Sequence, residues 1–90
     1  MIKKEGYLMN TLLYLKESIA NYTEDNKTGQ HIYNKLNSED YYDKEEFIND
    51  LSEEDVAYLN YILKKEMNYA RNAYDEIREK QLNEIYQHLY

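Results

Sequence analysis

The chain has 90 residues, of which 18 are acidic and 11 are Lys or Arg, so its formal net charge is −7 at pH 7. It has no cysteine, which excludes disulfide bridges and thiolate metal sites, and this length fits one acidic helical domain, residues 1–90. The chain has only two glycines and no proline, the residues that turns favour, and a single valine, a residue that sheets favour. We therefore expect an all-α fold.

An N-terminal helix is predicted over about residues 7–23. Apolar side chains recur at helical spacing from Leu8 to Ile19, which places them on one face. The polar stretch that follows ends at Gly29 and is typical of a turn in which Gly29 or Asn26 adopts positive φ.

Two short connecting helices are predicted next. The first covers about residues 30–37 and the second about residues 44–50. Asp43 precedes the second helix and Glu46 stands three residues later, which is an N-cap pattern. We expect the apolar side chains of both helices to face a shared core.

The last predicted helix is long, about residues 53–89, because this stretch has neither glycine nor proline. Ser52 is predicted to cap it, with Asp55 completing a capping box. A helix of about 38 residues spans roughly 57 Å, whereas a compact chain of this length has a radius of gyration of about 12 Å. The helix is therefore expected either to bend near residues 68–72 or to project and pair with another chain.

An apolar stripe follows this helix from Val56 to Ile77 and then resumes in a shifted phase beyond Gln81. Such a shift indicates a change of packing partner near the C-terminus. If the helix projects, the expected oligomer interface consists of Ile77, Leu82, Ile85 and Leu89.

The acidic charge is concentrated in one segment. Nine acidic residues and one basic residue, Lys44, lie between Glu39 and Asp55, and tyrosines are interleaved with them. Aromatic side chains among charges are typical of protein-binding surfaces. The predicted partner-binding residues are Glu39, Asp40, Tyr41, Tyr42, Asp43, Glu45, Glu46, Asp50, Glu53, Glu54, Tyr58 and Tyr61. The alternatives are a solvated acidic face with ordinary helix capping, and tyrosines that pack against the N-terminal helix.

No catalytic or metal-binding motif is recognisable in the sequence. The serines lie in a predicted helix or at caps, and Glu84 with His88 offers too few ligands for a metal site. The basic residues between Lys64 and Arg71 alternate with acids such as Glu66, which indicates i,i+4 pairs rather than a basic patch. We expect no enzymatic activity, no metal and no cofactor.

The predicted function is that of a small acidic regulator or inhibitor, of the nucleic-acid-mimic type, encoded by a phage or mobile element against host defence. Its partner would be a nucleic-acid-handling protein whose basic groove it blocks. Direct nucleic-acid binding is not expected, because like charges repel phosphates. The alternative is a helical scaffold subunit that forms a homodimer through the long C-terminal helix.

The short apolar run at residues 12–15 is followed by charged residues. This indicates neither a signal peptide nor a membrane span, so a cytoplasmic protein without membrane contact is expected.

Overall fold

The computed structural model describes residues 2–24, 26–38 and 41–89, with side chains from residue 11 onward. The elements, in order, are α1 (Ile2–Ile19), the 3₁₀ turn η1 (Ala20–Tyr22), α2 (Lys27–Ser38), α3 (Lys44–Asn49), α4 (Glu53–Asn72) and α5 (Glu76–Tyr86). Within these ranges there are helices and no strand, so the predicted all-α fold is confirmed. None of the described helices combines the length and apolarity that crossing a membrane requires.

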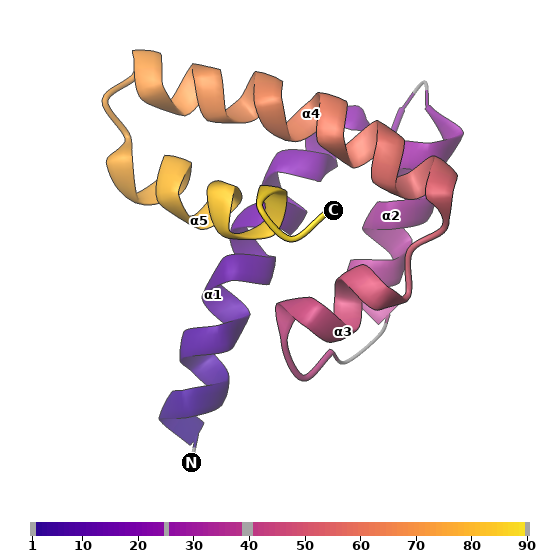
Figure 1. Cartoon of the computed structure of the whole chain (residues 1–90), viewed down its shortest axis with the longest axis horizontal. Coiled ribbons are helices and arrows are strands. Elements are labelled where there is room, and N and C mark those ends of the chain that lie inside the picture. The colour runs from indigo at the N-terminus through magenta and orange to yellow at the C-terminus, as the bar shows by residue number, and fades with distance from the viewer. Residues whose placement is uncertain (1, 25, 39–40, 90) are drawn as a thin grey trace.

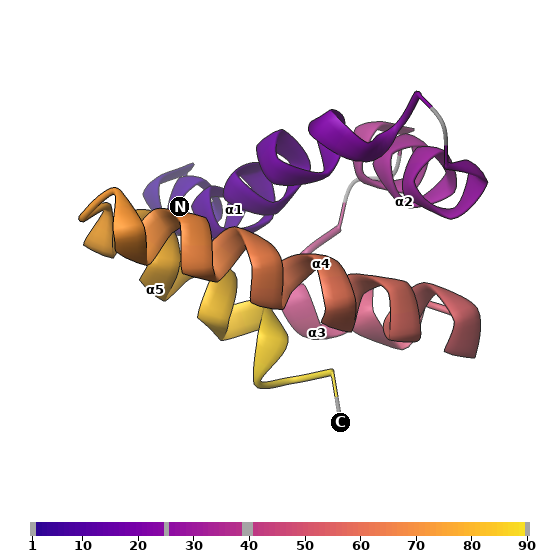
Figure 2. The same ribbon diagram turned by 90° about the horizontal axis from the view of Figure 1, so that it is seen from above.

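The helices α4 and α5 form an antiparallel hairpin, and α1 packs across it (Figure 1). The shorter helices α2 and α3 lie toward the N-terminal half of α4, and α2 follows α1 along one side of it (Figure 2). Every one of these helices contributes to a single core: Leu15, Ile19, Ile32, Phe47, Leu59, Ile62, Leu63, Met67, Leu82, Ile85 and Leu89. The radius of gyration is 12.4 Å, as expected for a compact chain of this length.

Gly29 lies inside α2 and not in a turn, and neither it nor Asn26 has the positive φ that was expected of one of them. It permits a close crossing of two backbones, because an added Cβ would lie 2.1 Å from the carbonyl oxygen of Tyr22. The side chain of Asn26 accepts a hydrogen bond from the Gly29 N–H at 2.8 Å, which satisfies a free donor of the first turn of α2.

Both predicted N-caps are confirmed. The Asp43 carboxylate accepts from the N–H of Glu46 at the start of α3. Ser52 caps α4 and forms a reciprocal capping box with Asp55. The long helix therefore begins where the sequence places it.

The stretch predicted as one helix over residues 53–89 is divided after Asn72. The division lies next to residues 68–72, where a bend was expected as one of the two alternatives. Tyr74 has φ of 58°, its N–H donates to Arg71 O, and the Asp75 N–H donates to Ala70 O at 2.8 Å. These two bonds form a Schellman motif, which satisfies the last carbonyls of a helix. Asp75 then caps α5 by accepting from the N–H of Arg78, so one short turn ends a helix and starts the next.

Candidate functional site

Part of the predicted acidic surface is held by contacts inside the chain. Asp50 accepts a hydrogen bond from the Tyr41 hydroxyl at 2.8 Å and pairs with Lys35 at 3.1 Å. The Tyr41 hydrogen bond, followed by Lys35, lowers the pKa of Asp50. Glu39 and Asp40 lie outside the described residues.

Other acids of this segment stabilise helix starts. Besides the Asp43 cap, the Glu46 carboxylate accepts from the backbone N–H of Tyr42 at 2.6 Å. Glu45 lies 3.5 Å from Nε2 of His88, next to the C-terminal end of α5. The Tyr42 side chain remains exposed. Much of the acidic character therefore serves capping and local pairing.

The remaining predicted binding residues do not share one environment. Glu53 and Glu54 are exposed on the first turn of α4, whereas Tyr58 is half-buried against the Gly29 crossing. Tyr61 is 60% exposed and lies beside lysines rather than beside the acids. The binding role of the predicted set as a whole stays a prediction.

Three of the four residues of the predicted oligomer interface lie in the chain's own core. Leu82 and Ile85 are fully buried and Leu89 is nearly so, because the turn after α4 folds α5 back. Ile77 is 65% exposed. An interface through these residues stays a prediction, and Ile77 is the member that reaches the surface.

A buried polar cluster connects α1, η1, α4 and α5. Glu66 is 5% exposed and accepts a hydrogen bond from the Tyr22 hydroxyl at 2.5 Å. Nη2 of Arg78 donates to the buried Ser18 hydroxyl at 2.8 Å and lies 3.4 Å from Oε1 of Glu66. The pKa of Tyr22 is raised, mainly by burial and to a smaller extent by Glu66. Sequence reasoning missed this cluster because its members come from separate elements and no spacing rule connects them.

The inward position of Glu66 changes how the charges of α4 must be interpreted. The expected i,i+4 pairing of its basic residues is wrong: Glu66 pairs with Arg78, twelve residues away, and Arg71 pairs with Glu79, eight residues away, at 2.7 Å. Lys64, which is exposed, makes no ion pair with any described residue. The fold therefore buries Glu66 and leaves Lys64 exposed, although the two residues are close in sequence.

Two adjoining hollows follow this basic side of α4. The first, here called the α4 groove, has a volume of about 530 Å³ and is lined by Tyr61, Lys64, Lys65, Met67, Asn68, Arg71 and Tyr86. The second has a volume of about 370 Å³ and is lined by Asn21, Tyr22, Glu24, Asn26, Tyr58, Tyr61, Ile62 and Lys65. They share Tyr61 and Lys65, and no carboxylate lines the α4 groove.

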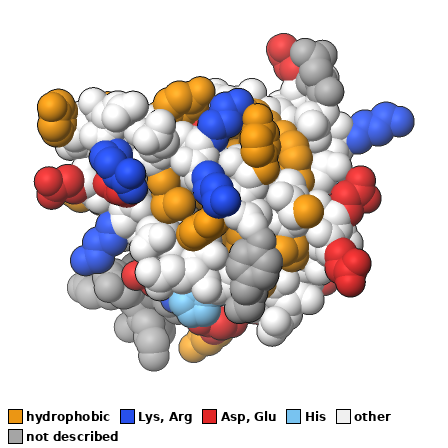
Figure 3. Space-filling view, turned by 45° about the horizontal axis from the view of Figure 1, so that its top comes forward, with side chains coloured by type: hydrophobic (Ala, Val, Ile, Leu, Met, Phe, Trp, Pro, Cys, Tyr) orange, Lys and Arg blue, Asp and Glu red, His pale blue; other side chains and the backbone are white. Residues whose placement is uncertain are grey.

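Lys65 is fixed between two aromatic rings. Its Nζ lies 5.5 Å from the ring centroid of Tyr22 and 5.4 Å from that of Tyr61, which are cation–π distances. In the space-filling view, Lys and Arg side chains lie next to hydrophobic ones, a class that includes Tyr, near the middle of this face, with acidic side chains toward the edges (Figure 3). The arrangement can attract an anion and offer it an aromatic surface.

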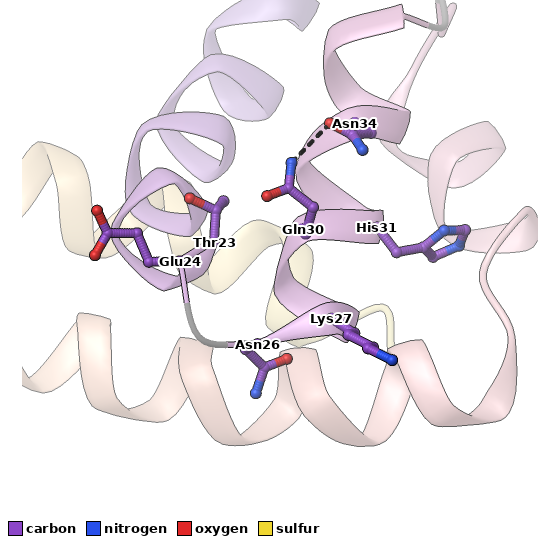
Figure 4. A pocket seen from close by; sticks show the side chains of 7 residues that line it. All are labelled: Thr23, Glu24, Asn26, Lys27, Gln30, His31 and Asn34. Atoms are coloured by element: carbon purple, nitrogen blue, oxygen red, sulfur yellow. Dashed lines mark hydrogen bonds between the residues drawn. The ribbon is translucent and has the colours of Figure 1, made fainter.

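A third hollow, of about 600 Å³, lies beside the N-terminal half of α2. Its lining is polar and of mixed charge: Thr23, Glu24, Asn26, Lys27, Gln30, His31 and Asn34. The side chains of Glu24 and His31 point in different directions, and Gln30 bonds to Asn34 on the same helix (Figure 4). His31 lies 3.5 Å from the buried Asp55. In the described part of the chain, no three or more His, Cys, Asp or Glu side chains group in a way that could hold a metal ion.

Relatives of the chain are known. The profile of the family described as "CsgA: Minor curli fiber component A" matches residues 8–90. The "Sigma-G-dependent sporulation-specific SASP protein" of Bacillus subtilis (strain 168) is 43% identical over 77 residues, which cover 86% of this chain and 93% of that protein. No solved structure is significantly similar to the chain.

The SASP relationship overturns the predicted function. The name of that relative, a sporulation-specific SASP protein, does not fit the predicted nucleic-acid mimic and phage inhibitor of host defence, nor the scaffold subunit given as the alternative. The similarity to this sporulation protein also contradicts the expected partner with a basic groove and the exclusion of direct nucleic-acid binding. That exclusion rested on repulsion between the acidic residues and phosphates, whereas Lys and Arg side chains lie near the middle of the face shown in Figure 3.

Neither the family description nor the name of the sporulation protein refers to an enzyme. The profile spans nearly the whole chain, and the identity to the sporulation protein extends over most of both sequences. The chain therefore belongs to the CsgA family, described as minor curli fiber component A, and is related to the sporulation-specific SASP protein of Bacillus subtilis.

Proposed function

We propose that this chain is a sporulation-specific protein of the small acid-soluble class that binds nucleic acid and has no enzymatic role. The similarity to the SASP protein supports this assignment, because it extends over 93% of that protein at 43% identity. By the same relationship, its synthesis depends on sigma G and it resides in the cytoplasm of the spore.

The family description points instead to a fibre component, and the helical fold weighs against the kind of fibre that stacked strands form. Fibres of that kind grow from extended segments that pair along exposed edges. In residues 2–24, 26–38 and 41–89 every regular element is a helix. We therefore base the proposal on the sporulation protein.

The observation that carries nucleic-acid binding is the α4 groove. Lys64, Lys65 and Arg71 line it, and the nearest acid in the sequence, Glu66, is buried and bonded to Tyr22. Cationic side chains on one exposed face are the usual partners of phosphates.

Glu79 pairs with Arg71 at 2.7 Å, whereas the exposed acids at the start of α4 are too far from Lys64 to cancel its charge. Glu54 precedes Lys64 by ten positions on α4, or roughly 15 Å along the axis, which exceeds the Debye length of about 8 Å at physiological salt. With three cations at most, the interaction is expected to be weak and strongly dependent on salt.

Titration of a labelled oligonucleotide, followed by fluorescence anisotropy, tests the proposal. Three phosphate contacts predict a log–log salt slope of about −2 to −3, so a tenfold rise in salt weakens binding by about a hundredfold to a thousandfold. The double variant Lys64→Glu with Lys65→Glu should abolish binding at low salt.

The matched control is Lys27→Glu with Lys80→Glu, which changes the net charge equally at two exposed lysines outside the α4 groove. It should weaken binding only slightly, through the general field of the molecule. Absence of binding by the wild type at low salt, or an equal loss in both double variants, rejects the proposal. Circular dichroism verifies that both variants remain folded.

A further inference from the structure

The ridge between the two hollows combines a cation with an exposed aromatic ring. Tyr61 and Lys65 line both hollows. Tyr61 is 60% exposed although the Lys65 ammonium lies over its ring. A groove that bound phosphates alone would need no aromatic ring on its rim. This ring therefore calls for a ligand that has a flat face as well as a charge.

We propose that the α4 groove prefers single-stranded to duplex nucleic acid, with a base stacked on Tyr61 and the adjoining phosphates on Lys64 and Arg71. This inference rests on the proposed nucleic-acid binding and specifies the form of the ligand. Stacking on aromatic side chains combined with a cationic track is the general way in which proteins hold single strands.

The spacing of the groove residues fits a short strand. Tyr61, Lys64, Asn68 and Arg71 follow one another at intervals of three or four residues, so they share one face of α4. From Tyr61 to Arg71 the helix rises roughly 15 Å, which corresponds to about four nucleotides at 3.4 Å each. The amide of Asn68, in the middle of the row, can hydrogen-bond to a base edge or a sugar.

The aromatic ring already has one contact before a ligand arrives. Lys65 lies between the rings of Tyr61 and Tyr22, and the Tyr22 hydroxyl is bonded to the buried Glu66. The ridge is thereby connected to the polar cluster beneath it. Less side-chain freedom is lost on binding when the contact residue is already ordered.

A duplex cannot use this ring. Its bases are already stacked on one another, and their faces are inaccessible from outside, so Tyr61 would meet only sugar and phosphate. Arg71 is paired with Glu79 at 2.7 Å, so a phosphate of either form must compete with that carboxylate. A duplex would therefore be held by the cations of the groove alone, without the support of the ring.

The test compares single-stranded and duplex oligonucleotides of equal length by anisotropy at low salt. We expect the single strand to bind at least about tenfold more tightly. Tyr61→Leu, which keeps bulk but removes the ring, should weaken single-strand binding about fivefold to a hundredfold and leave duplex binding unchanged. Tyr61→Phe, which keeps the ring, should bind like the wild type.

Tyr42→Leu is the matched control, because Tyr42 is 65% exposed and lines neither hollow. Its affinity should equal that of the wild type. Equal affinity for the two nucleic acids, or a Tyr61→Leu variant that binds like the wild type, overturns the single-strand preference. In that case the proposed function still holds if binding is sensitive to salt and depends on Lys64 and Lys65. If neither nucleic acid binds, the proposed function fails as well.

Discussion

Glu66 shows how a single residue directs the surface chemistry of α4. A carboxylate removed from water must be paired and hydrogen-bonded, and Tyr22 and Arg78 meet that need from η1 and α5. Because Glu66 is satisfied inside, it does not neutralise Lys65, its neighbour in sequence. The same contact that stabilises the helix packing also leaves the outer face basic.

The hydroxyl of Tyr22 makes this cluster sensitive to high pH. Burial and Glu66 raise the pKa of Tyr22 above its ordinary value of 10.0, so the folded state favours the neutral phenol. The stability that this contributes is fully present below pH 10 and is lost as pH rises toward the folded-state pKa. We predict that the stability advantage of the wild type over Tyr22→Phe shrinks above pH 10, by at most about 1.4 kcal/mol per pH unit.

Urea unfolding of both proteins, followed by circular dichroism from neutral to alkaline pH, measures this difference. Lysines titrate in the same range but are present in both proteins, so their effect cancels. Two stability curves that stay parallel through pH 10 and above would contradict the prediction.

At the scale of elements, the turn after α4 decides the architecture. Tyr74 takes a left-handed conformation, which costs a residue with a Cβ about 1–2 kcal/mol. The turn returns Leu82 and Ile85 to the core, and each such burial contributes about 1.5–3 kcal/mol. Burial outweighs backbone strain, and α4 ends although no glycine or proline marks the site.

Tyr74→Gly should stabilise the protein. The Tyr74 side chain is 90% exposed and contributes little packing, so glycine relieves the left-handed strain at small cost. We expect a gain of about 1 kcal/mol, or an increase in Tm of about 4–8 °C, in thermal unfolding followed by circular dichroism. Ala73→Gly is the control: Ala73 has φ of −93°, and its replacement should destabilise. A Tyr74→Gly variant less stable than the wild type would show that the strain is not relieved.

The sequence predicts those features of the elements that depend on neighbouring residues. Asp43 and Ser52 were identified as caps because a cap and its acceptor lie within one turn. The break at Tyr74 was placed only approximately, since the energy that favours it comes from α1 and the core. The α4 groove was missed for a similar reason: the position of Glu66 depends on Arg78, which the turn brings back against α4.

At the scale of the whole molecule, one core joins all the helices. Leu15 of α1, Phe47 of α3, Leu63 of α4 and Ile85 of α5 are fully buried in the same cluster. A chain of this size has little apolar area to spare, so its helices are expected to unfold together.

Ile85→Ala tests this cooperativity. Removing a fully buried isoleucine side chain down to alanine should cost about 2–5 kcal/mol. If the chain unfolds as one unit, amide hydrogen exchange followed by mass spectrometry should show protection falling in α1 and α4 as much as in α5. A loss of protection confined to α5 would instead make the C-terminal helix a separate folding unit.

The segregation of charge along α4 has a consequence for how the molecule approaches a polyanion. Glu53 and Glu54 stand on the first turn, whereas Lys64, Lys65 and Arg71 occupy the second half, so the side-chain charges of the two halves of the helix differ in sign and form a dipole. In the proposed complex, the field of the nucleic acid would exert a torque on this dipole and turn the basic half toward the strand before contact. Molecules bound in this way would direct their carboxylates to the solvent, and strands coated with them would repel one another rather than condense.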